Sequence, residues 1–539
     1  MMAHPFNAQG RSEALTKMAS GIVDLLIIGG GITGTGLARD AALRGLSVAL
    51  VEKEDFAYGT SSRSSKLVHG GLRYLANGQV NVVRESARER KVLKQIAPHL
   101  VHPLPFVFPI YKGDSAMKMR AGFFLFDKLA NVTDQEKHQV LSEQEVRTYA
   151  PGLKEDLKSG FVYGEYMTED ARFTMENAAS AVEHGALVAN HAEVIELIEA
   201  DGNITGAKVI DKYSKQTYVI QSHVTVNATG PWAQQLLENT GYQAPKKLLL
   251  SKGIHLVFRK DRLPIEAAVT LTSKSGKMGF LIPRWNYVYV GTTDRRHDGP
   301  IDQPQSDHTA IEELLQLVQE SFPSLELTEN DVVGTWAGVR PLIAEGKSER
   351  ETSRHDEVWK IKPGLFTVAG GKLTTYRQMA DRILNEVATE LERDIGNNER
   401  TMSVPLPGGV FEEAYEIFKE KAAQALADYQ LSELTIERIV WLYGNKVFTL
   451  LAYAEEDKTW FEPLAPNVPA IKGEVRLALE QEMVLSVADF IDRRSSLLLF
   501  SDEHGRTCAE TVAAIMGEYL GWTDNETDYQ IEQFLQLQT

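Results

Sequence analysis

Two short apolar runs stand near the start of the chain. Residues 23–28 are apolar apart from one aspartate, and residues 47–51 form a second run of the same kind. Both are typical of buried strands. Between them, apolar residues recur at helical spacing: Leu37, Ala38, Ala41, Ala42 and Leu43. The pattern predicts a strand, a helix and a second strand at the beginning of the fold.

A second pattern begins near residue 245 and predicts a mainly antiparallel sheet. Short apolar or alternating runs separated by turns are expected to form strands at Leu248–Phe258, Ala268–Thr272, Gly279–Pro283 and Tyr287–Thr293. Helical spacing follows over Thr309–Phe322. Further on, Leu365–Ala369 predicts a strand, and Tyr376–Leu391 predicts a helix after a glycine-containing turn.

The last quarter of the chain has helical periods and no strand pattern. Proline and glycine at 402–409 mark a domain boundary. Helices are expected at Phe411–Tyr429, Glu433–Tyr443, Lys446–Ala454, Ile471–Glu482, Leu485–Arg493, Cys508–Gly521 and Asp528–Leu537. Residues 410–539 are therefore predicted to form an all-helical domain. Two roles for this domain stay open: a contact between the subunits of a homodimer, or a cap over the side of the protein that meets the electron acceptor.

The turn after the first strand has the chemistry of a dinucleotide site. Gly29 is expected to make the tight turn, Gly31 to let the backbone approach a diphosphate, and Gly34 to let the helix pack on the strand. The helix N-terminus would face the phosphates, and Glu52, directly after the second strand, would bind ribose hydroxyls. These features predict an α/β fold with a Rossmann-like βαβ domain of the glutathione-reductase type.

Two later segments favour FAD over NAD. Hydroxyl residues crowd positions 60–65, as suits a loop along a diphosphate and ribityl chain, and a distant Gly-Gly-Lys-Leu-Thr-Thr turn at 370–375 could bring a helix N-terminus to the flavin. The FAD domain is then assembled from about 20–80, 160–240 and 335–400 within a 21–400 oxidoreductase region, with the substrate domain between these pieces and residues 1–20 as an extension. Further cofactor contacts are expected from Thr60, Ser61, Ser62, Ser65, Lys66, Leu67, Gly71, Gly230, Gly371, Leu373 and Thr374.

Composition narrows the function. The 539 residues suffice for several domains, and a net charge of −17 argues against a nucleic-acid partner. The single cysteine, Cys508, permits no disulfide within the chain and no cysteine-rich metal site, so a bound cofactor must carry electrons and no metal is expected. Residues 1–20 do not resemble a signal peptide, and the expected location is the cytoplasm.

Several specific strings then give the chain a family resemblance. They are Ser-Ser-Lys-Leu-Val-His-Gly-Gly-Leu-Arg-Tyr-Leu at 64–75, Asn-Ala-Thr-Gly-Pro-Trp at 227–232, Lys-Gly-Ile-His at 252–255, Gly-Thr-Thr-Asp at 291–294, Gly-Val-Arg-Pro at 338–341 and Gly-Gly-Lys-Leu-Thr-Thr-Tyr at 370–376. In this order the chain resembles the FAD-dependent, respiratory, quinone-linked glycerol-3-phosphate dehydrogenases over most of its length. Asp-Arg-Arg at 492–494, followed by Leu497–Phe500, resembles that family's helical cap.

The resemblance implies oxidation of sn-glycerol 3-phosphate to dihydroxyacetone phosphate, with hydride transfer from C2 to flavin N5 and electrons passed to a membrane quinone. An alternative is the related oxidase, which uses oxygen and releases hydrogen peroxide; its usual extra segment has no evident place here. Amine and hydroxy-acid oxidases share the fold, and a lesser alternative is an FAD redox sensor or binding subunit.

Glycerol 3-phosphate is a dianionic secondary alcohol, so its site needs cations and a base. Arg73, Arg340 and Lys372 lie in the specific strings and are expected to bind the phosphate, an assignment that the resemblance also implies. Tyr74 could donate to the phosphate or pack under the flavin. His255 is the first choice for the base and His69 the second, while Arg340 would stabilise the developing alkoxide.

A quinone acceptor implies contact with the inner face of the cell membrane. Residues 118–129 mix lysine and arginine with large apolar side chains, as an interfacial helix does. The same pattern also suits a helix packed on the core with solvated ends, which is the more common case.

Overall fold

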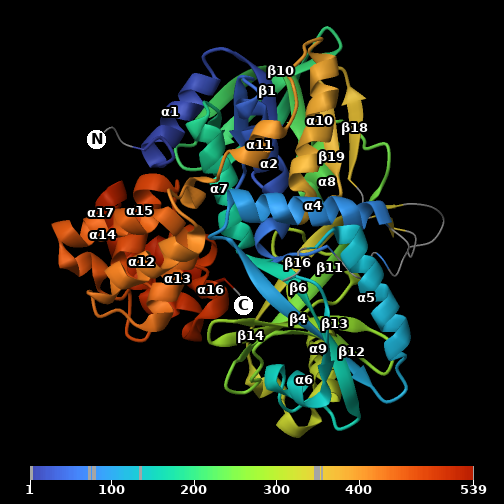
Figure 1. The fold of residues 1–539 in the computed structure, drawn as a ribbon. Helices are drawn as coiled ribbons and strands as arrows, with labels where there is room; N and C mark the ends of the chain where they lie inside the picture. Colours follow the sequence, from blue (N-terminus) through green and yellow to red (C-terminus); the bar gives the residue numbers. More distant parts are fainter. Residues whose placement is uncertain are drawn as a thin grey trace.

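The computed structural model describes residues 4–70, 75, 80–132, 136–344, 352–353 and 356–537. Two sheets and a helical domain make up this part of the chain. Figure 1 shows the first sheet with its helices at the top, the second sheet below it, and the helical domain, orange to red, at the left. No helix in the described ranges is long and apolar enough to span a membrane.

The first sheet is parallel at its centre, in the order β19, β10, β1, β2, β7. These strands are β1 (Ile22–Ile28), β2 (Val48–Val51), β7 (Leu187–Ala189), β10 (Thr217–Asn227) and β19 (Leu365–Ala369). β18 (Glu357–Lys362) pairs antiparallel with β19, while β8 (Ala192–Ala200) and β9 (Asn203–Asp211) extend antiparallel from β10. Ile28 pairs with both Val51 and Asn227, so three carboxyl ends lie together.

Helices bury the faces of this sheet. α2 (Ile32–Leu43) packs against α7 (Asp170–Glu183) and α10 (Tyr376–Glu390) over a shared apolar core. α1 (Ala8–Met18) packs against β7 and β10, with Leu15 and Met18 fully buried. Residues 8–18 of the expected extension at 1–20 therefore form a helix of the first domain. The sequence did not indicate this packing, because only a few apolar residues make up the buried face of the helix.

The second sheet runs in the order β17, β16, β11, β14, β13, β12, β4, β6, β3. All of these neighbours are antiparallel except β12 and β4, which confirms the mainly antiparallel sheet. Its strands are β3 (Leu67–Val68), β4 (Val101–Tyr111), β5 (Gln139–Ser142), β6 (Leu157–Thr168), β11 (Leu248–Arg259), β12 (Ala268–Thr272), β13 (Met278–Arg284), β14 (Tyr287–Gly291), β15 (Arg295–Arg296), β16 (Val332–Ala344) and β17 (Thr352–Ser353).

Two strands belong to a different sheet from the one expected. β6 and β16 pair with β4 and β11, so the starts of the predicted FAD pieces, 160 and 335, fall inside strands of the second sheet. Each strand leads from the second sheet back to the first, and an apolar pattern does not say which sheet a strand joins.

The remaining helices of these two domains are mostly short or peripheral. α9 (His308–Ser321) covers the second sheet, and α4 (Val80–Ile96) packs against α5 (Ala116–Ala130). Within the described residues, the others are α6 (Glu143–Tyr149), α8 (Ala233–Asn239), α11 (Glu399–Ser403), and the 3-10 turns η1 (Thr60–Ser62), η2 (Gly230–Trp232), η3 (Pro323–Leu325), η4 (Glu329–Asp331), η5 (Leu373–Thr375) and η6 (Pro407–Gly409).

The carboxyl-terminal region is helical, as predicted. It contains α12 (Tyr415–Ala427), α13 (Glu433–Tyr443), η7 (Gly444–Lys446), α14 (Val447–Glu456), η8 (Lys458–Phe461), α15 (Lys472–Gln481), η9 (Asp489–Arg494), α16 (Leu497–Phe500), η10 (Asp502–Cys508), α17 (Ala509–Leu520) and α18 (Asp524–Leu535). Three helices begin four residues away from the predicted start, and the first of them, α12, begins at Tyr415 instead of Phe411. In place of the helix expected at 485–493, the structure has a single π-helical turn, η9, over Asp489–Arg494. α18 begins four residues early because Thr523 caps it and exchanges hydrogen bonds with Glu526.

Candidate active site

The glycine turn joins β1 to α2 at the carboxyl end of the parallel strands. Gly29 has φ of +115°, and a Cβ on Gly34 would lie 1.9 Å from the Gly29 carbonyl oxygen. A side chain at either position would prevent this close approach of helix and turn. A Cβ on Gly31 would lie 3.2 Å from the Ser61 hydroxyl. The tight turn expected at Gly29 and the close packing expected at Gly34 thus agree with the local geometry, and the diphosphate contact expected at Gly31 stays a prediction.

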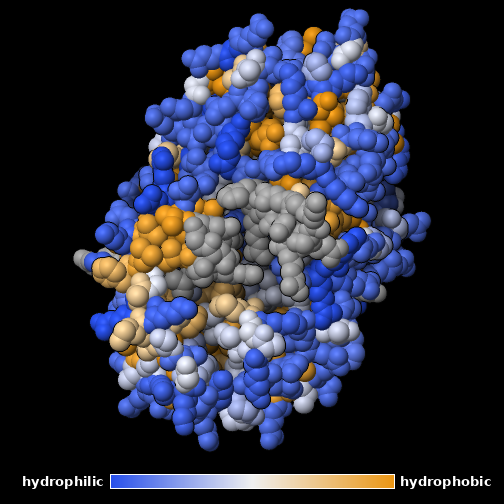
Figure 2. All heavy atoms as spheres, turned by 90° about the vertical axis from the view of Figure 1, so that its right-hand side faces the viewer, coloured by the Kyte–Doolittle hydropathy of each residue, from blue (hydrophilic) through white to orange (hydrophobic). Residues whose placement is uncertain are grey.

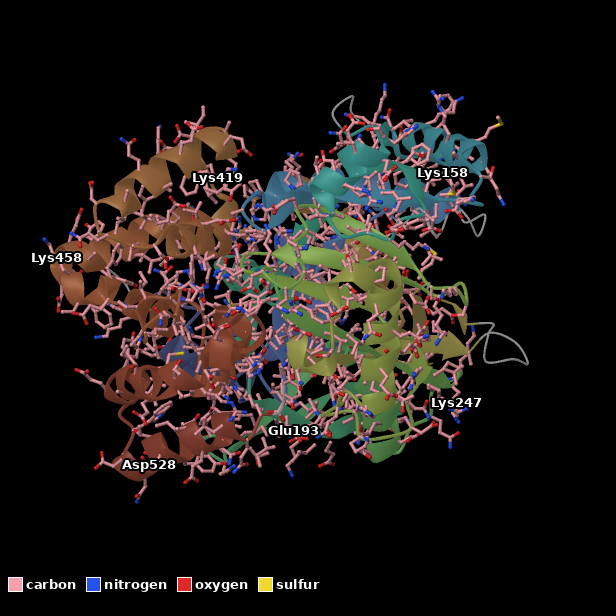
Figure 3. The ribbon with its side chains drawn as sticks, turned by 90° about the horizontal axis from the view of Figure 1, so that it is seen from below. Lys158, Glu193, Lys247, Lys419, Lys458 and Asp528 are labelled. Carbon is pink, nitrogen blue, oxygen red and sulfur yellow. The ribbon has the colours of Figure 1, made fainter. Side chains whose placement is uncertain are left out.

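A cavity of about 600 Å³ opens beside this turn. The glycine turn, Glu52, the loop at 59–67, the 228–232 segment and the 370–374 turn all contribute to its lining. Such a volume is in the range of cofactor pockets, about 300–1,000 Å³. Glu193 lines one part of the cavity and lies at the lower edge of the molecule in Figure 3, so the cavity reaches the surface there.

Glu52 lies directly after β2 and lines the cavity. One carboxylate oxygen accepts a hydrogen bond from the Gly30 N–H at 2.6 Å, and the other accepts from the Glu54 N–H at 2.8 Å. Burial raises the pKa of Glu52, while these two N–H groups oppose that shift. The side chain is fixed at the position where a ribose is expected.

We call residues 59–67 the serine loop. The loop is fixed to its surroundings from several sides. The Ser61 hydroxyl accepts from the Ile32 N–H at 2.9 Å, which ties the loop to the start of α2. The Thr60 hydroxyl donates to the Val339 carbonyl at 2.6 Å, which ties it to β16. The Ser64 hydroxyl donates to Asp170 at 2.7 Å, which ties it to α7. Thr60, Ser61, Ser65 and Leu67 line the cavity, as expected of cofactor contacts.

Lys66 and Ser62 are placed differently from the rest of the loop. Lys66 is buried and binds Asp170 at 2.6 Å and Glu169 at 3.0 Å, and neither Lys66 nor Ser62 is among the residues that line the cavity. Burial alone would lower the pKa of Lys66, but Asp170 and Glu169 raise it above its usual value. Neither side chain borders the cavity, because Lys66 holds the loop to α7 and the Ser62 hydroxyl accepts a hydrogen bond from Arg63.

The second group of cavity residues carries positive charge. Arg340 lines the cavity, and its guanidinium donates to the Thr292 hydroxyl at 2.8 Å and lies over Gly253, where a Cβ would come within 2.3 Å. Lys372 lines the cavity beside Gly371, whose φ is +99°. β16 and the turn after β19 therefore bring two of the predicted cations to one cavity.

The two predicted histidines have different positions. His69 is partly buried and lines the cavity. His255 is 1% exposed and is not part of the lining; its Nε2 lies 2.8 Å from the Ser65 hydroxyl, and its ring stacks on Trp336. Burial, then Arg340 and Lys66, lowers the pKa of His255 well below its usual value. Ser65, which lines the cavity, thus lies between the His255 Nε2 atom and the cavity.

The other predicted site residues either line the cavity or lie outside the residues that the structure describes. Gly230, Gly371, Leu373 and Thr374 line the cavity, and Gly230 has φ of +57°. Leu373 and Thr374 begin the short turn that leads into α10, so a second helix N-terminus faces this site. Gly71, Arg73 and Tyr74 lie outside the residues that the structure describes.

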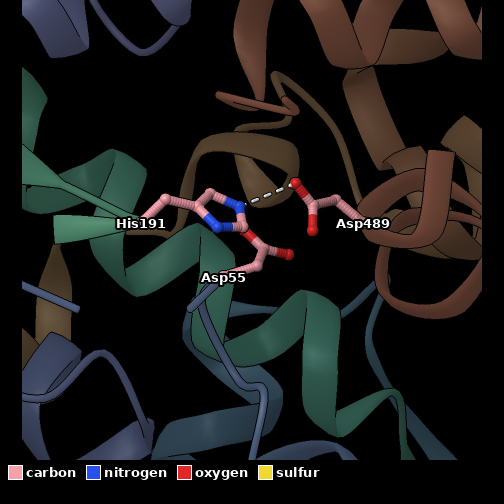
Figure 4. Close-up of side chains that lie close together, drawn as sticks. All are labelled: Asp55, His191 and Asp489. Carbon is pink, nitrogen blue, oxygen red and sulfur yellow. Dashed lines mark hydrogen bonds and ion pairs between the residues drawn. The ribbon is translucent and has the colours of Figure 1, made fainter. Parts of the chain in front are cut away.

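Acidic residues that hold the site were missed in the sequence. Glu169, Asp170 and Asp55 lie in none of the specific strings, and Asp492, although it begins the Asp-Arg-Arg string at 492–494, was not expected at the site. Their spacing along the chain carries no signal, because each acts on a segment far away in sequence. Figure 4 shows one such group, in which His191 Nε2 lies 3.0 Å from Asp489 and Asp55 lies beside them. Asp55 also binds Arg494 at 2.6 Å, and Asp489 binds Arg493 at 2.7 Å, so the group is an ion-pair network between domains.

These features fit FAD. The glycine turn at the start of α2 offers backbone N–H groups to a diphosphate, and Glu52 offers its carboxylate to a ribose. The hydroxyls of the serine loop continue the same lining, and the 370–374 turn closes it from a distant segment. The fold and site define the class of the protein: an FAD-dependent oxidoreductase. The model of the family described as FAD dependent oxidoreductase matches residues 24–377.

The particular family follows from close relatives. The chain belongs to the aerobic glycerol-3-phosphate dehydrogenase family. It is 38% identical to the protein of that name from Bacillus subtilis (strain 168), over 100% of this chain and 98% of the relative. It is also 38% identical to the protein of the same name from Staphylococcus aureus (strain USA300), over 95% and 93%. Residues 399–527 match the model described as the C-terminal domain of alpha-glycerophosphate oxidase.

Solved structures agree. The glycerol-3-phosphate dehydrogenase from Bacillus halodurans, complexed with FAD, superposes with a TM-score of 0.83 at 34% identity, over 99% of this chain and 98% of that one. The L-alpha-glycerophosphate oxidase from Mycoplasma pneumoniae, with FAD bound, gives 0.55 at 17% identity, over 70% and 96%. The second likeness shows a shared fold.

Proposed function

We propose that this protein oxidises sn-glycerol 3-phosphate to dihydroxyacetone phosphate and passes the electrons to a membrane quinone. One observation carries the substrate: two cations, Arg340 and Lys372, line the same cavity as the dinucleotide-binding glycine turn. The names of the close relatives support the same assignment. A simple hydroxy acid or amine would not call for two cations.

The residues of the cavity have separate roles in binding the substrate and in moving its proton. Bound FAD supplies the two-electron acceptor for the C2–H bond. Lys372 gives the phosphate a point charge, and the Arg340 guanidinium offers paired donors to a phosphate or to a developing alkoxide. His69, which lines the cavity, takes the proton of the C2 hydroxyl, and neutral His255 orients Ser65. The sequence made His255 the first choice for the base and His69 the second. This assignment reverses that preference, because of the two only His69 borders the cavity.

Anaerobic flavin bleaching tests the substrate. Purified, FAD-loaded protein is mixed with glycerol 3-phosphate, and the flavin absorbance is followed before a quinone analogue or oxygen is added. Bleaching that recovers fast with quinone and slowly with oxygen is the expected result. Fast recovery with oxygen and release of peroxide would favour the oxidase, and absence of bleaching in loaded protein would overturn the substrate.

A membrane partner is supported by the surface of α4 and α5. α5 buries Phe123 and Phe126 but leaves Met117, Phe124 and Leu125 exposed by 84%, 67% and 46%. Figure 2, which views the side of the molecule where α5 lies, shows apolar side chains gathered among hydrophilic ones. The exposed basic residues of the two helices are Arg84, Arg88, Lys91, Lys94, Lys118, Arg120 and Lys128.

This combination suits an anionic lipid surface. The whole chain carries −17, so a basic patch here is a local exception, and each basic residue near an anionic membrane contributes about 1 kcal/mol. Exposed phenylalanine and leucine can enter the interface while lysine and arginine bind the headgroups. The α4–α5 surface thus supports localisation at the inner face of the cell membrane.

Vesicle sedimentation tests the surface. The protein is expected to bind vesicles that contain phosphatidylglycerol more strongly than pure phosphatidylcholine vesicles, and less strongly at high salt. The F124S/L125S double variant should lose most of this binding. The F448S variant is the matched control, since Phe448 is 54% exposed on α14 of the helical domain. Equal loss in both variants, or binding unchanged in F124S/L125S, would contradict the proposal.

A further inference from the structure

The helical domain reaches the cofactor cavity through one carboxylate. Asp492 lies in η9, and its side chain is 1% exposed. Its two oxygens accept from the Arg63 guanidinium, Oδ2 from Nη2 at 2.6 Å and Oδ1 from Nη1 at 3.1 Å. The pair is bidentate, a geometry that fixes the plane of the arginine. The two residues are far apart in sequence and belong to different domains.

Arg63 belongs to the serine loop and lines the cavity. Its backbone has little freedom, because a Cβ on Gly338 of β16 would lie 2.7 Å from the Arg63 carbonyl oxygen. Its Nη1 also lies 2.9 Å from the hydroxyl of Ser62. The guanidinium therefore has a fixed place at the cavity wall, on the same loop as the lining residues Thr60 and Ser65.

Asp492 is itself held and ionised. Arg493 donates to it at 2.8 Å and also to Asp55 at 2.8 Å. Burial alone would raise the pKa of Asp492, but Arg63 and Arg493 lower it below its usual value. A negative charge thus stands directly behind the positive charge of Arg63, and the two offset each other as seen from the cavity.

We propose that Asp492 is a positioning residue through which the helical domain fixes Arg63 at the cofactor and sets how strongly that arginine favours reduced flavin. The inference rests on the FAD site of the proposed function, but not on its substrate. Negative charge accumulates on a flavin when it is reduced, so a nearby cation favours the reduced form. Arg63 has this effect, and Asp492 moderates it.

The two partners consequently act in opposite directions. Removing the negative charge of Asp492 leaves the positive charge of Arg63 without its counter-charge, and the equilibrium between oxidised and reduced flavin shifts toward the reduced form. Removing the positive charge of Arg63 shifts the same equilibrium toward the oxidised form. A pair that served only to hold the two domains together would give the same change from either side, because either substitution breaks the same contact.

The test uses the full-length holoenzyme and needs no glycerol 3-phosphate. The flavin is reduced in equilibrium with a redox dye, and FAD release is followed by fluorescence. D492N is expected to shift the equilibrium toward reduced flavin by about three- to tenfold, the scale of one partly screened charge, and R63Q is expected to shift it the other way. Both should release FAD faster, and D492E should restore much of the wild-type behaviour.

The outcomes separate the possibilities. Shifts of the same sign, or no shift in either variant, would overturn the inference. D502N is the control, because Asp502 of the same helical domain pairs with Arg259 of β11 at 2.9 Å but is 64% exposed and lies outside the cavity lining, and it should leave both readouts unchanged. If D492N does not fold, R63K and R63Q decide: R63K keeps the charge and the equilibrium, and equal shifts in both would contradict the proposal. Failure of the bleaching test with glycerol 3-phosphate would leave these measurements unaffected.

Discussion

At the scale of single residues, burial separates two histidines that look alike in the sequence. His69 borders the cavity, whereas the His255 ring lies 4.5 Å from that of Trp336, nearly parallel to it, behind Ser65. A buried imidazole with a lowered pKa is neutral at physiological pH and is a poor destination for a proton. Its suitable role is to orient the Ser65 hydroxyl.

The two histidines should therefore respond differently to substitution. H69Q is expected to slow flavin reduction by glycerol 3-phosphate by about 10²-fold or more, the usual contribution of a general base. H255Q should slow it much less, because glutamine can still hydrogen-bond Ser65. Stopped-flow measurement of the reductive half-reaction checks both. A larger loss in H255Q than in H69Q would return the role of base to His255.

At the scale of elements, most of the fold was predictable because local pattern and tertiary role agree. The β1, α2, β2 unit, the strands at 248–291 and the helices after 410 each carry their own period. The sheet to which β6 and β16 belong was not predictable, since that depends on partners far away in sequence. The same holds for Lys66, whose direction is decided by Asp170 of α7.

The glycine turn offers a test at this scale. G34A places a methyl group where the Gly29 carbonyl oxygen lies 1.9 Å away, so α2 must shift from the turn. Overpacking of this kind costs about 1–3 kcal/mol, and FAD retention should fall with it. G21A is the matched control, as a Cβ there meets nothing within 4 Å. Urea unfolding and FAD content after dialysis measure both effects; equal behaviour of the two variants would refute the close-packing role of Gly34.

At the scale of the whole molecule, buried ion pairs join the helical domain to the first domain. Arg172 of α7 binds Glu482 at 2.7 Å, and both side chains are fully buried. Asp55 meets Arg493 and Arg494 close by. Removing one partner from a buried pair leaves an uncompensated charge, which costs about 3–5 kcal/mol. These contacts make domain docking dependent on the ionisation of a few carboxylates.

Acid should therefore weaken the molecule at this interface first. Burial alone would raise the pKa of Glu482, but Arg172 and Lys446 lower it to about 2, from 4.5 for the free side chain. Because the pKa is lower in the folded state, the stabilisation is complete above pH 4.5 and is lost as pH falls toward about 2. Its size is about 3 kcal/mol by linkage.

Unfolding free energies measured between pH 7 and pH 2 in wild type and E482Q test this. E482Q should be less stable at pH 7 by about 3 kcal/mol or more, and the difference should shrink as the solution is acidified, because the wild-type carboxylate then becomes neutral as well. E456Q is the control: Glu456 pairs with Arg476 at 2.8 Å but is 61% exposed, so its loss should cost less than about 1 kcal/mol at any pH. A difference between wild type and E482Q that stayed constant down to pH 2 would show that the Glu482 carboxylate does not link pH to domain docking.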